Sequence, residues 1–222
     1  MQWIHKFQLF LFDFDGLLVN TERLHYQAYV KMLAGRGISL RWDFERFCSL
    51  AHRNATALRE ALYAEYPTLD PDWSALYAEK KRAYGELIAN GKIELMPGVA
   101  PLLAALEKAN IERCVVTNSF HEQIATIRFF SKPLQSIAHW ITREQYNQPK
   151  PSPECYQLAI ERYAKPGDRV IGFEDSLRGL QALQGSSALA VLVCAANHPL
   201  LAEVAPGTLH TSSLENISHC LE

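Results

Sequence analysis

Two aspartates, Asp13 and Asp15, stand two positions apart at the end of an apolar run and directly before Gly16. An apolar and aromatic run that ends abruptly in acids is typical of a strand buried on both faces of a parallel sheet. Two carboxylates held this close repel one another, so a cation is expected between them. Mg²⁺ fits, because it is a hard cation that takes carboxylate oxygens together with substrate phosphate. The alternative is a polar turn that closes a strand.

A hydroxyl-bearing turn follows a second apolar strand pattern. Val115 and Val116 lead directly into Thr117, Asn118 and Ser119. A hydroxyl group and backbone N–H groups at a strand-to-helix turn suit a phosphate, because the helix N-terminus adds partial positive charge. The same residue types also serve as ordinary helix N-caps, so both interpretations stay open at this point.

One lysine, Lys150, lies between Pro149 and Pro151 just before an expected helix. Prolines fix φ and remove competing backbone donors, so the lysine is presented on a stiff segment. A rigidly held ammonium group can screen carboxylate repulsion and hold a phosphate. The alternative is a solvated loop lysine.

A second pair of acids, Glu174 and Asp175, follows a strand pattern at 169–173 and precedes Ser176. Acids at the carboxyl end of a strand lie where open α/β folds bind their ligands. The alternative is helix capping by Asp175 or Ser176, with a favourable interaction with the helix dipole.

Each of these motifs is expected to follow a β-strand, and the sequence predicts a regular alternation of strands and helices. Besides the run before Asp13, strands are expected at 113–117, 137–141, 169–173, 188–193 and near 208–210. Helices are expected from residue 97 onward and over 121–130, 153–164, 177–184 and about 213–221. Strands alternating with helices imply right-handed parallel crossovers and an α/β, doubly wound parallel sheet with a Rossmann-like core.

No strand pattern is visible between about residues 20 and 92. Helical stretches are expected there over 21–36, 43–50, 54–66 and 72–90. An all-helical insert between the first strand and the rest of the sheet indicates a cap domain. The predicted domains are therefore an α/β core, 1–19 with 93–222, and a helical cap, 20–92.

The four motifs, in this order and each at the end of an expected strand, resemble those of the haloacid dehalogenase-like hydrolases. Asp-Phe-Asp-Gly-Leu-Leu-Val-Asn-Thr-Glu, from Asp13 onward, resembles the first motif of the branch that contains β-phosphoglucomutase and many small-molecule phosphatases. Thr-Asn-Ser, Lys-Pro-x-Pro and Glu-Asp resemble the second, third and fourth motifs. The resemblance covers essentially the whole chain, although the cap matches only in kind and position.

This resemblance implies an Mg²⁺-dependent phosphatase that cleaves a small-molecule phosphomonoester, such as a sugar phosphate, through an aspartyl-phosphate. Asp13 would be the nucleophile and Asp15 the general acid and base. The implied metal ligands are Asp13, the Asp15 backbone carbonyl and Asp175, with Glu174 acting through water or orienting a neighbour. The implied phosphate contacts are Thr117, the Asn118 backbone and the catalytic lysine, Lys150.

Two other functions stay open. A β-phosphoglucomutase-like phosphomutase would need a second phosphate contact in the cap, for which His25 and Arg53 are candidates, with Ser119 a further candidate substrate contact. A non-catalytic binding protein on the same fold is the other, although the three key acids are present. In the family that the motifs resemble, dehalogenases lack the second aspartate, so the presence of Asp15 argues against dehalogenation. Phosphonate hydrolysis in that family needs a Schiff-base lysine near the start of the cap, and residues 17–30 contain no lysine.

Composition and charge narrow the possible functions and cellular locations further. The 222 residues are 48% hydrophobic and 21% charged, as in ordinary globular proteins. The net charge of −2 gives no electrostatic support for nucleic acid binding, and no apolar run is long enough to span a membrane. Five dispersed cysteines and the lack of a signal-peptide pattern predict a cytoplasmic protein with reduced thiols. We expect a monomer, as is usual among relatives, whereas the particular phosphate ester is not readable.

Overall fold

The computed structural model describes residues 1–51, 55–90 and 94–221. The chain forms two compact units, Met1–Asn20 with Ile93–Glu222 and Thr21–Lys92. We call the first unit the core and the second the cap. Among the described residues, none of the helices is both long and apolar enough to cross a membrane.

A six-stranded parallel sheet, in the order β3-β2-β1-β4-β5-β6, organises the core. Its strands are β1 (Leu9–Phe12), β2 (Glu112–Val116), β3 (His139–Ile141), β4 (Val170–Glu174), β5 (Leu189–Val193) and β6 (Leu209–Thr211). The chain builds outward from β1 to β3 and then crosses back to β4 on the other side of β1. The predicted doubly wound α/β fold is confirmed.

The central strand, β1, is buried along its whole length, as its uninterrupted apolar sequence predicts. Phe12 stacks on Phe173 of β4, with ring centroids 5.4 Å apart. Phe12 is also level with Val115 on β2. The residues that follow these three strands therefore emerge at one edge of the sheet, where parallel α/β folds bind ligands.

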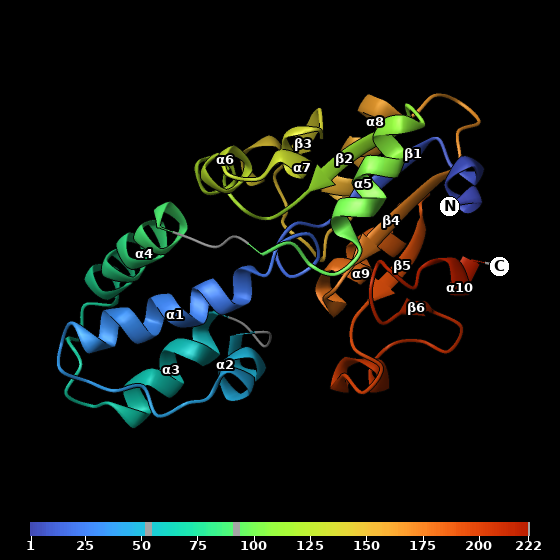
Figure 1. Ribbon diagram of the computed structural model, residues 1–222. Coiled ribbons are helices and arrows are strands. Elements are labelled where there is room, and N and C mark those ends of the chain that lie inside the picture. Colours follow the sequence, from blue (N-terminus) through green and yellow to red (C-terminus); the bar gives the residue numbers. More distant parts are fainter. Residues whose placement is uncertain (52–54, 91–93, 222) are drawn as a thin grey trace. The chain divides into compact units, whose positions relative to one another are not determined.

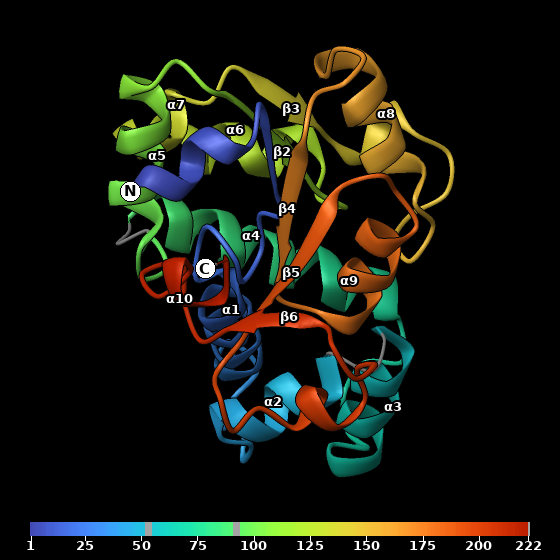
Figure 2. The ribbon, with the colours of Figure 1, turned by 90° about the vertical axis from the view of Figure 1, so that its right-hand side faces the viewer.

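Helices cover both faces of the sheet (Figure 2), with α8 and α9 on one face and α5, α6 and α7 on the other. The core helices are α5 (Val99–Lys108), α6 (His121–Phe129), α7 (Lys132–Gln135), α8 (Glu154–Tyr163), α9 (Leu177–Gln184) and α10 (Ser218–Leu221). Short 3-10 helices are η1 (Gln2–Lys6), η2 (Arg143–Gln145) and η3 (Pro199–Ala202). Burying both faces explains why the strands read as continuous apolar runs.

Two of the expected elements differ most from the sequence-based prediction. The third strand is shorter than 137–141, because Ile137 donates its N–H to the Leu134 carbonyl and so closes the short helix α7. The terminal helix occupies only Ser218–Leu221 in place of about 213–221. Leu214, in the loop before it, is buried, so an apolar residue anchors that loop without being helical.

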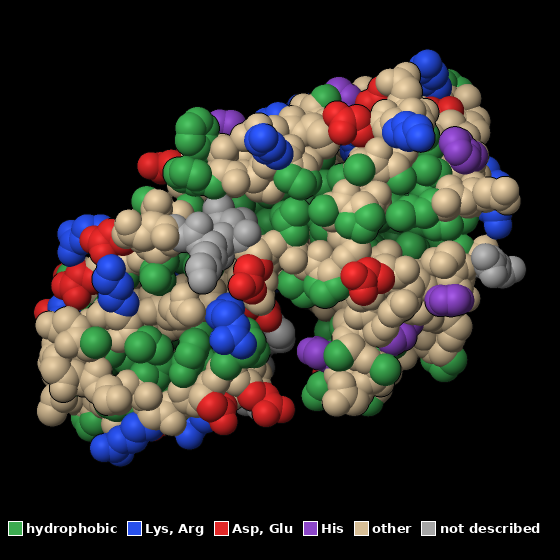
Figure 3. All heavy atoms as spheres, in the orientation of Figure 1, with side chains coloured by type: hydrophobic (Ala, Val, Ile, Leu, Met, Phe, Trp, Pro, Cys, Tyr) green, Lys and Arg blue, Asp and Glu red, His purple; other side chains and the backbone are tan. Residues whose placement is uncertain are grey.

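The cap consists of α1 (Thr21–Ala34), α2 (Phe44–Ala51), α3 (Ala55–Glu65) and α4 (Trp73–Ala89), as a helical insert predicts. Its own apolar core includes Leu33, Leu62 and Leu76, each almost fully buried. Exposed ion pairs join α4 to α1 and to the loop after it, at Glu86 with Lys31 and at Glu79 with Arg36. Charges of both signs are interspersed on the described surface that Figure 3 shows.

Candidate active site

The ends of β1, β2 and β4 bring the predicted motif residues together. Asp13 continues from β1 and donates its N–H to the Phe173 carbonyl of β4 at 3.1 Å. Thr117, directly after β2, donates its N–H to the Ile141 carbonyl of β3 at 3.0 Å. These backbone bonds extend the sheet by one residue, so the side chains that follow have fixed positions. The place is also where the strand order reverses direction around β1 and β4, the usual ligand site of such sheets.

Three carboxylates gather at this edge. One oxygen atom from each of Asp13, Glu174 and Asp175 lies within 4.8 Å of the other two. Gly16 makes room for this group: its φ is +85°, and a Cβ atom there would lie 2.1 Å from Oδ2 of Asp175. An all-oxygen donor set of this size suits a hard divalent cation such as Mg²⁺. The residues present therefore fit the metal that the family resemblance implies.

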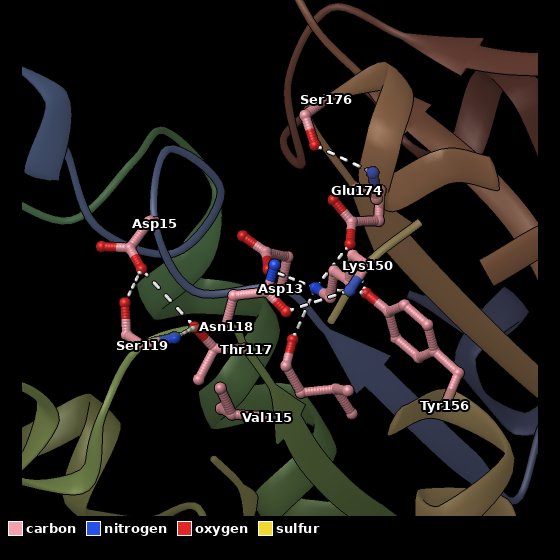
Figure 4. A network of polar contacts seen from close by, with 12 residues as sticks. Asp13, Asp15, Val115, Thr117, Asn118, Ser119, Lys150, Tyr156, Glu174 and Ser176 are labelled. Carbon is pink, nitrogen blue, oxygen red and sulfur yellow. Dashed lines mark hydrogen bonds and ion pairs between the residues drawn. The ribbon is translucent and has the colours of Figure 1, made fainter. Parts of the chain in front are cut away.

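Lys150 lies at the centre of the buried polar network (Figure 4). Its Nζ atom lies 2.5 Å from Oδ1 of Asp13 and 2.6 Å from Oε1 of Glu174. The Val116 carbonyl at 2.8 Å and the Tyr156 hydroxyl at 3.0 Å complete its surroundings. Only 5% of the lysine is exposed, so it is not a solvated loop lysine.

The charges at this edge do not balance. Three carboxylates face one ammonium group, so the four side chains sum to −2 when all are ionised. Burial raises the pKa of Asp13 to about 7; the Lys150 charge opposes this rise, and Glu174 and Asp15 add to it. Burial alone would lower the pKa of Lys150, but Asp13 and Glu174 outweigh it and raise that pKa. The site therefore favours a further positive charge.

Asp15 lies apart from this cluster and faces the turn after β2 (Figure 4). Its Oδ2 atom accepts a hydrogen bond from Ser119 Oγ at 2.5 Å and a long one from Thr117 Oγ1 at 3.5 Å. Thr117 Oγ1 in turn accepts from the Ser119 N–H at 2.9 Å. Ser119, predicted as a substrate contact, thus holds the proposed acid and base in this structure.

The Asn118 side chain ties two loops together. Its Oδ1 atom accepts from the Tyr146 hydroxyl at 2.7 Å and from the backbone N–H of Lys150 at 3.2 Å. The Tyr146 hydroxyl also lies 2.8 Å from the Thr117 carbonyl. With its side chain used in this way, Asn118 has its backbone to offer to a phosphate, as the resemblance implies.

Tyr156, a fully buried residue of α8, belongs to the site although no sequence motif indicates it. Its hydroxyl group donates to Oε1 of Glu174 at 2.5 Å, and its ring lies 4.8 Å from Lys150 Nζ. Apolar helical periodicity indicates that residue 156 is buried, but no sequence pattern shows where its hydroxyl group points. Glu174, expected to act through water or to orient a neighbour, lies 2.6 Å from the Lys150 Nζ atom.

His25 is the one predicted cap residue among those that the structure describes. In the cap, the His25 ring stacks on Tyr84 with centroids 4.4 Å apart, and its Nδ1 atom lies 2.6 Å from Lys80 Nζ. Burial, and second the Lys80 charge, lower the pKa of His25 to about 3. Arg53 lies outside the described residues. The substrate contacts of His25, Arg53 and Ser119 stay predictions.

Comparison with known proteins identifies the family of this chain. The model of the haloacid dehalogenase-like hydrolases matches residues 7–186. Protein CbbY of Cereibacter sphaeroides is 31% identical over 182 residues, which are 79% of this chain and 79% of CbbY. The phosphorylated carbohydrates phosphatase of Thermotoga maritima is 28% identical over 179 residues, 79% of this chain and 80% of that protein.

Comparison with solved structures finds a protein of the same name among the similar folds. A variant of CbbY from Rhodobacter sphaeroides, in complex with xylulose-(1,5)bisphosphate, superposes with a TM-score of 0.73 at 26% identity. The match covers 94% of this chain and 95% of that one. The resemblance to the family, first seen in the four motifs, is therefore confirmed. This chain belongs to the haloacid dehalogenase-like hydrolase family and is an enzyme of that family.

Proposed function

We propose that this enzyme is an Mg²⁺-dependent phosphatase that hydrolyses a small-molecule phosphomonoester, with sugar phosphates as the substrate class. The observation that carries the proposal is the contact of Lys150 with both Asp13 and Glu174, with the Asp175 carboxylate beside them and Asp15 two residues after Asp13. The relatives named above as a phosphatase of phosphorylated carbohydrates and as a complex with a sugar bisphosphate support the substrate class.

In the first step, a carboxylate oxygen of Asp13 attacks phosphorus and the ester P–O bond breaks, which gives an aspartyl-phosphate and an alcohol. Lys150 holds Oδ1 of Asp13 at 2.5 Å and so fixes the direction in which the nucleophile points. Asp15 gives its proton to the departing alkoxide. Thr117, the Asn118 backbone and Lys150 bind phosphoryl oxygens.

In the second step, Asp15 takes a proton from a water molecule, whose oxygen attacks phosphorus and releases Asp13 and inorganic phosphate. One group serves in both directions, because the proton lost to the alcohol is recovered from the water. Ser119 and Thr117 hold Asp15 on the β2 side of the site. Phosphoryl transfer mainly needs positioning and charge stabilisation, which these side chains can supply.

The residues that would hold Mg²⁺ are Asp13, Asp175 and the Asp15 backbone carbonyl, with Glu174 beside them. Bound there, the ion would offset the repulsion between these carboxylates and an incoming phosphate dianion. The proposal also includes that the enzyme acts in the cytoplasm and is a monomer.

A phosphate-release assay tests the proposal. The panel contains sugar phosphates, nucleotides and aryl phosphates with Mg²⁺, and includes glucose 1-phosphate with catalytic glucose 1,6-bisphosphate, read for isomerisation as well. We expect release from several sugar phosphates, its loss with EDTA and its return with added Mg²⁺. Isomerisation without release would replace the phosphatase by a phosphomutase, and silence on both with Mg²⁺ bound would favour a binding protein.

The matched variants are Asp13→Asn and Asp168→Asn. Asp168 belongs to the same unit but precedes β4, at the opposite end of the sheet, where it accepts the Lys165 N–H at 2.7 Å. We expect Asp13→Asn to lose at least about a thousandfold in kcat, as removal of a nucleophile does. Asp168→Asn should keep the parent rate. Near-parent activity of Asp13→Asn would remove Asp13 as the nucleophile.

A further inference from the structure

Tyr156 contributes the one hydroxyl group, among the described residues, that contacts both Lys150 and Glu174. It lies in the first turn of α8 and is completely buried in an apolar cluster with Leu11, Val116 and others. A buried tyrosine hydroxyl must find a partner, because leaving it unbonded is costly. Here both partners belong to the candidate active site.

The direction of each hydrogen bond in this group follows from its chemistry. A charged lysine can only donate, so the Lys150 ammonium donates to the Tyr156 oxygen at 3.0 Å. An ionised carboxylate can only accept, so the Tyr156 hydroxyl gives its single proton to Oε1 of Glu174 at 2.5 Å. Glu174 lies beside Asp13 and Asp175. The ammonium group that contacts Glu174 also contacts Asp13.

The lysine has more acceptors than protons. Four oxygen atoms, from Asp13, Val116, Tyr156 and Glu174, lie within 3.0 Å of Nζ, but an ammonium group has three N–H bonds. The Tyr156 proton satisfies part of the demand of Glu174. Without it, Lys150 would be the one remaining donor to that carboxylate among the described contacts, and the ammonium group would be pulled away from Asp13.

We propose that Tyr156 is a positioning residue whose hydroxyl group fixes Glu174 and thereby keeps the Lys150 ammonium shared between Glu174 and Asp13. This inference rests on the proposed function of the same site. Tyr156 touches no reacting atom and acts through its two neighbours. Its effect should therefore reach the orientation of Asp13 and the affinity of the carboxylate cluster for Mg²⁺, with little effect on substrate binding.

Tyr156→Phe and Tyr163→Phe form a matched pair for the test. Both residues lie on α8 and both variants lose one hydroxyl group, but Tyr163 stacks on His139, 4.0 Å between ring centroids, away from Lys150. In Tyr156→Phe we expect kcat to fall about tenfold with KM nearly unchanged, which is the size of one lost hydrogen bond to a charged group. Calorimetry on the resting protein should show Mg²⁺ binding weakened by about threefold to tenfold.

Tyr163→Phe should match the parent in both measurements. A parent-like kcat and Mg²⁺ affinity in Tyr156→Phe would overturn the inference, and so would equal losses in the two variants, because these would reflect packing of α8. Circular dichroism and thermal unfolding come first, to establish that both variants fold.

A measurement on the parent protein covers the case in which Tyr156→Phe does not fold. Proton NMR should show a downfield Tyr156 hydroxyl signal protected from exchange with water, because that proton is buried and donated to a carboxylate. A rapidly exchanging hydroxyl proton would overturn the inference. This test is independent of turnover: if the parent releases no phosphate, the proposed function fails, whereas the NMR result still decides whether Tyr156 holds Glu174.

Discussion

Each of the two units buries a lysine, and the two lysines have different surroundings. Lys150 of the core is 5% exposed and lies against the carboxylates of Asp13 and Glu174. Lys80 of the cap is 4% exposed, and its contacts include Nδ1 of His25 at 2.6 Å and the ring of Tyr84 at 5.0 Å. Burying an ammonium group is expensive unless it gains compensating interactions. The core lysine gains them from opposite charges, and the contacts of the cap lysine include an imidazole nitrogen and aromatic faces.

The difference teaches what each lysine can do. Lys150 is part of a cluster that is short of positive charge, so its removal changes the charge balance of the site. Lys80 holds a neutral partner, because the pKa of His25 is lowered to about 3 by burial first and by Lys80 second. The cap pair can therefore hold α1 against α4 within the cap.

Replacing the core lysine should give the largest effect. Lys150→Met leaves Asp13 and Glu174 buried without their counter-charge, and losing one partner of a buried ion pair typically costs about 3–5 kcal/mol of unfolding free energy. We expect phosphate release to fall at least about a thousandfold. Urea unfolding and the release assay measure the two effects.

The stability loss of Lys150→Met should shrink when Mg²⁺ is added, because the ion supplies the missing positive charge. It should also be smaller at pH 5 than at pH 8, because Asp13, whose pKa is already about 7, is then protonated. Parent-like activity in this variant would remove Lys150 from the mechanism and end the contrast between the two lysines.

The motifs around Lys150 were predictable because each is local: an apolar run ends in residues that can bind a phosphate or a cation. Asp13, Thr117 and Glu174 emerge at one edge because parallel strands align their carboxyl ends. Tyr156 and Lys80 were not predictable in the same way. Helical spacing shows that a position is buried but not where a hydroxyl group points, and a lysine on an amphipathic helix normally indicates the solvent side.

Replacing the cap lysine should have a smaller effect. In Lys80→Met the hydrogen bond to His25 and the contacts with tyrosine rings are lost, worth about 1–3 kcal/mol together, but the cost of burying the charge disappears as well. We expect a smaller loss of unfolding free energy than in Lys150→Met, measured by urea unfolding of the two variants side by side. Equal losses in the two variants would break the comparison.

The pH dependence of stability gives the smallest and most specific effect. His25 has a folded pKa of about 3 against 6.5 for an unperturbed histidine, so the unfolded chain binds its proton first as the pH falls. The contribution of neutral His25 to the free energy of unfolding is present above pH 6.5 and is lost progressively between pH 6.5 and 3. Because His25 is partly exposed, we expect a loss of about 1–2 kcal/mol between pH 7 and 5.

Urea unfolding of the parent and of His25→Gln at both pH values measures this loss. The difference between the two proteins should be largest at pH 7 and should shrink at pH 5. In Lys80→Met most of the dependence should remain, because burial is the larger cause of the lowered pKa and the Lys80 charge the smaller. If the dependence instead vanished with Lys80, the charge of the lysine would control His25, and the cap pair would be governed by electrostatics as strongly as the core cluster.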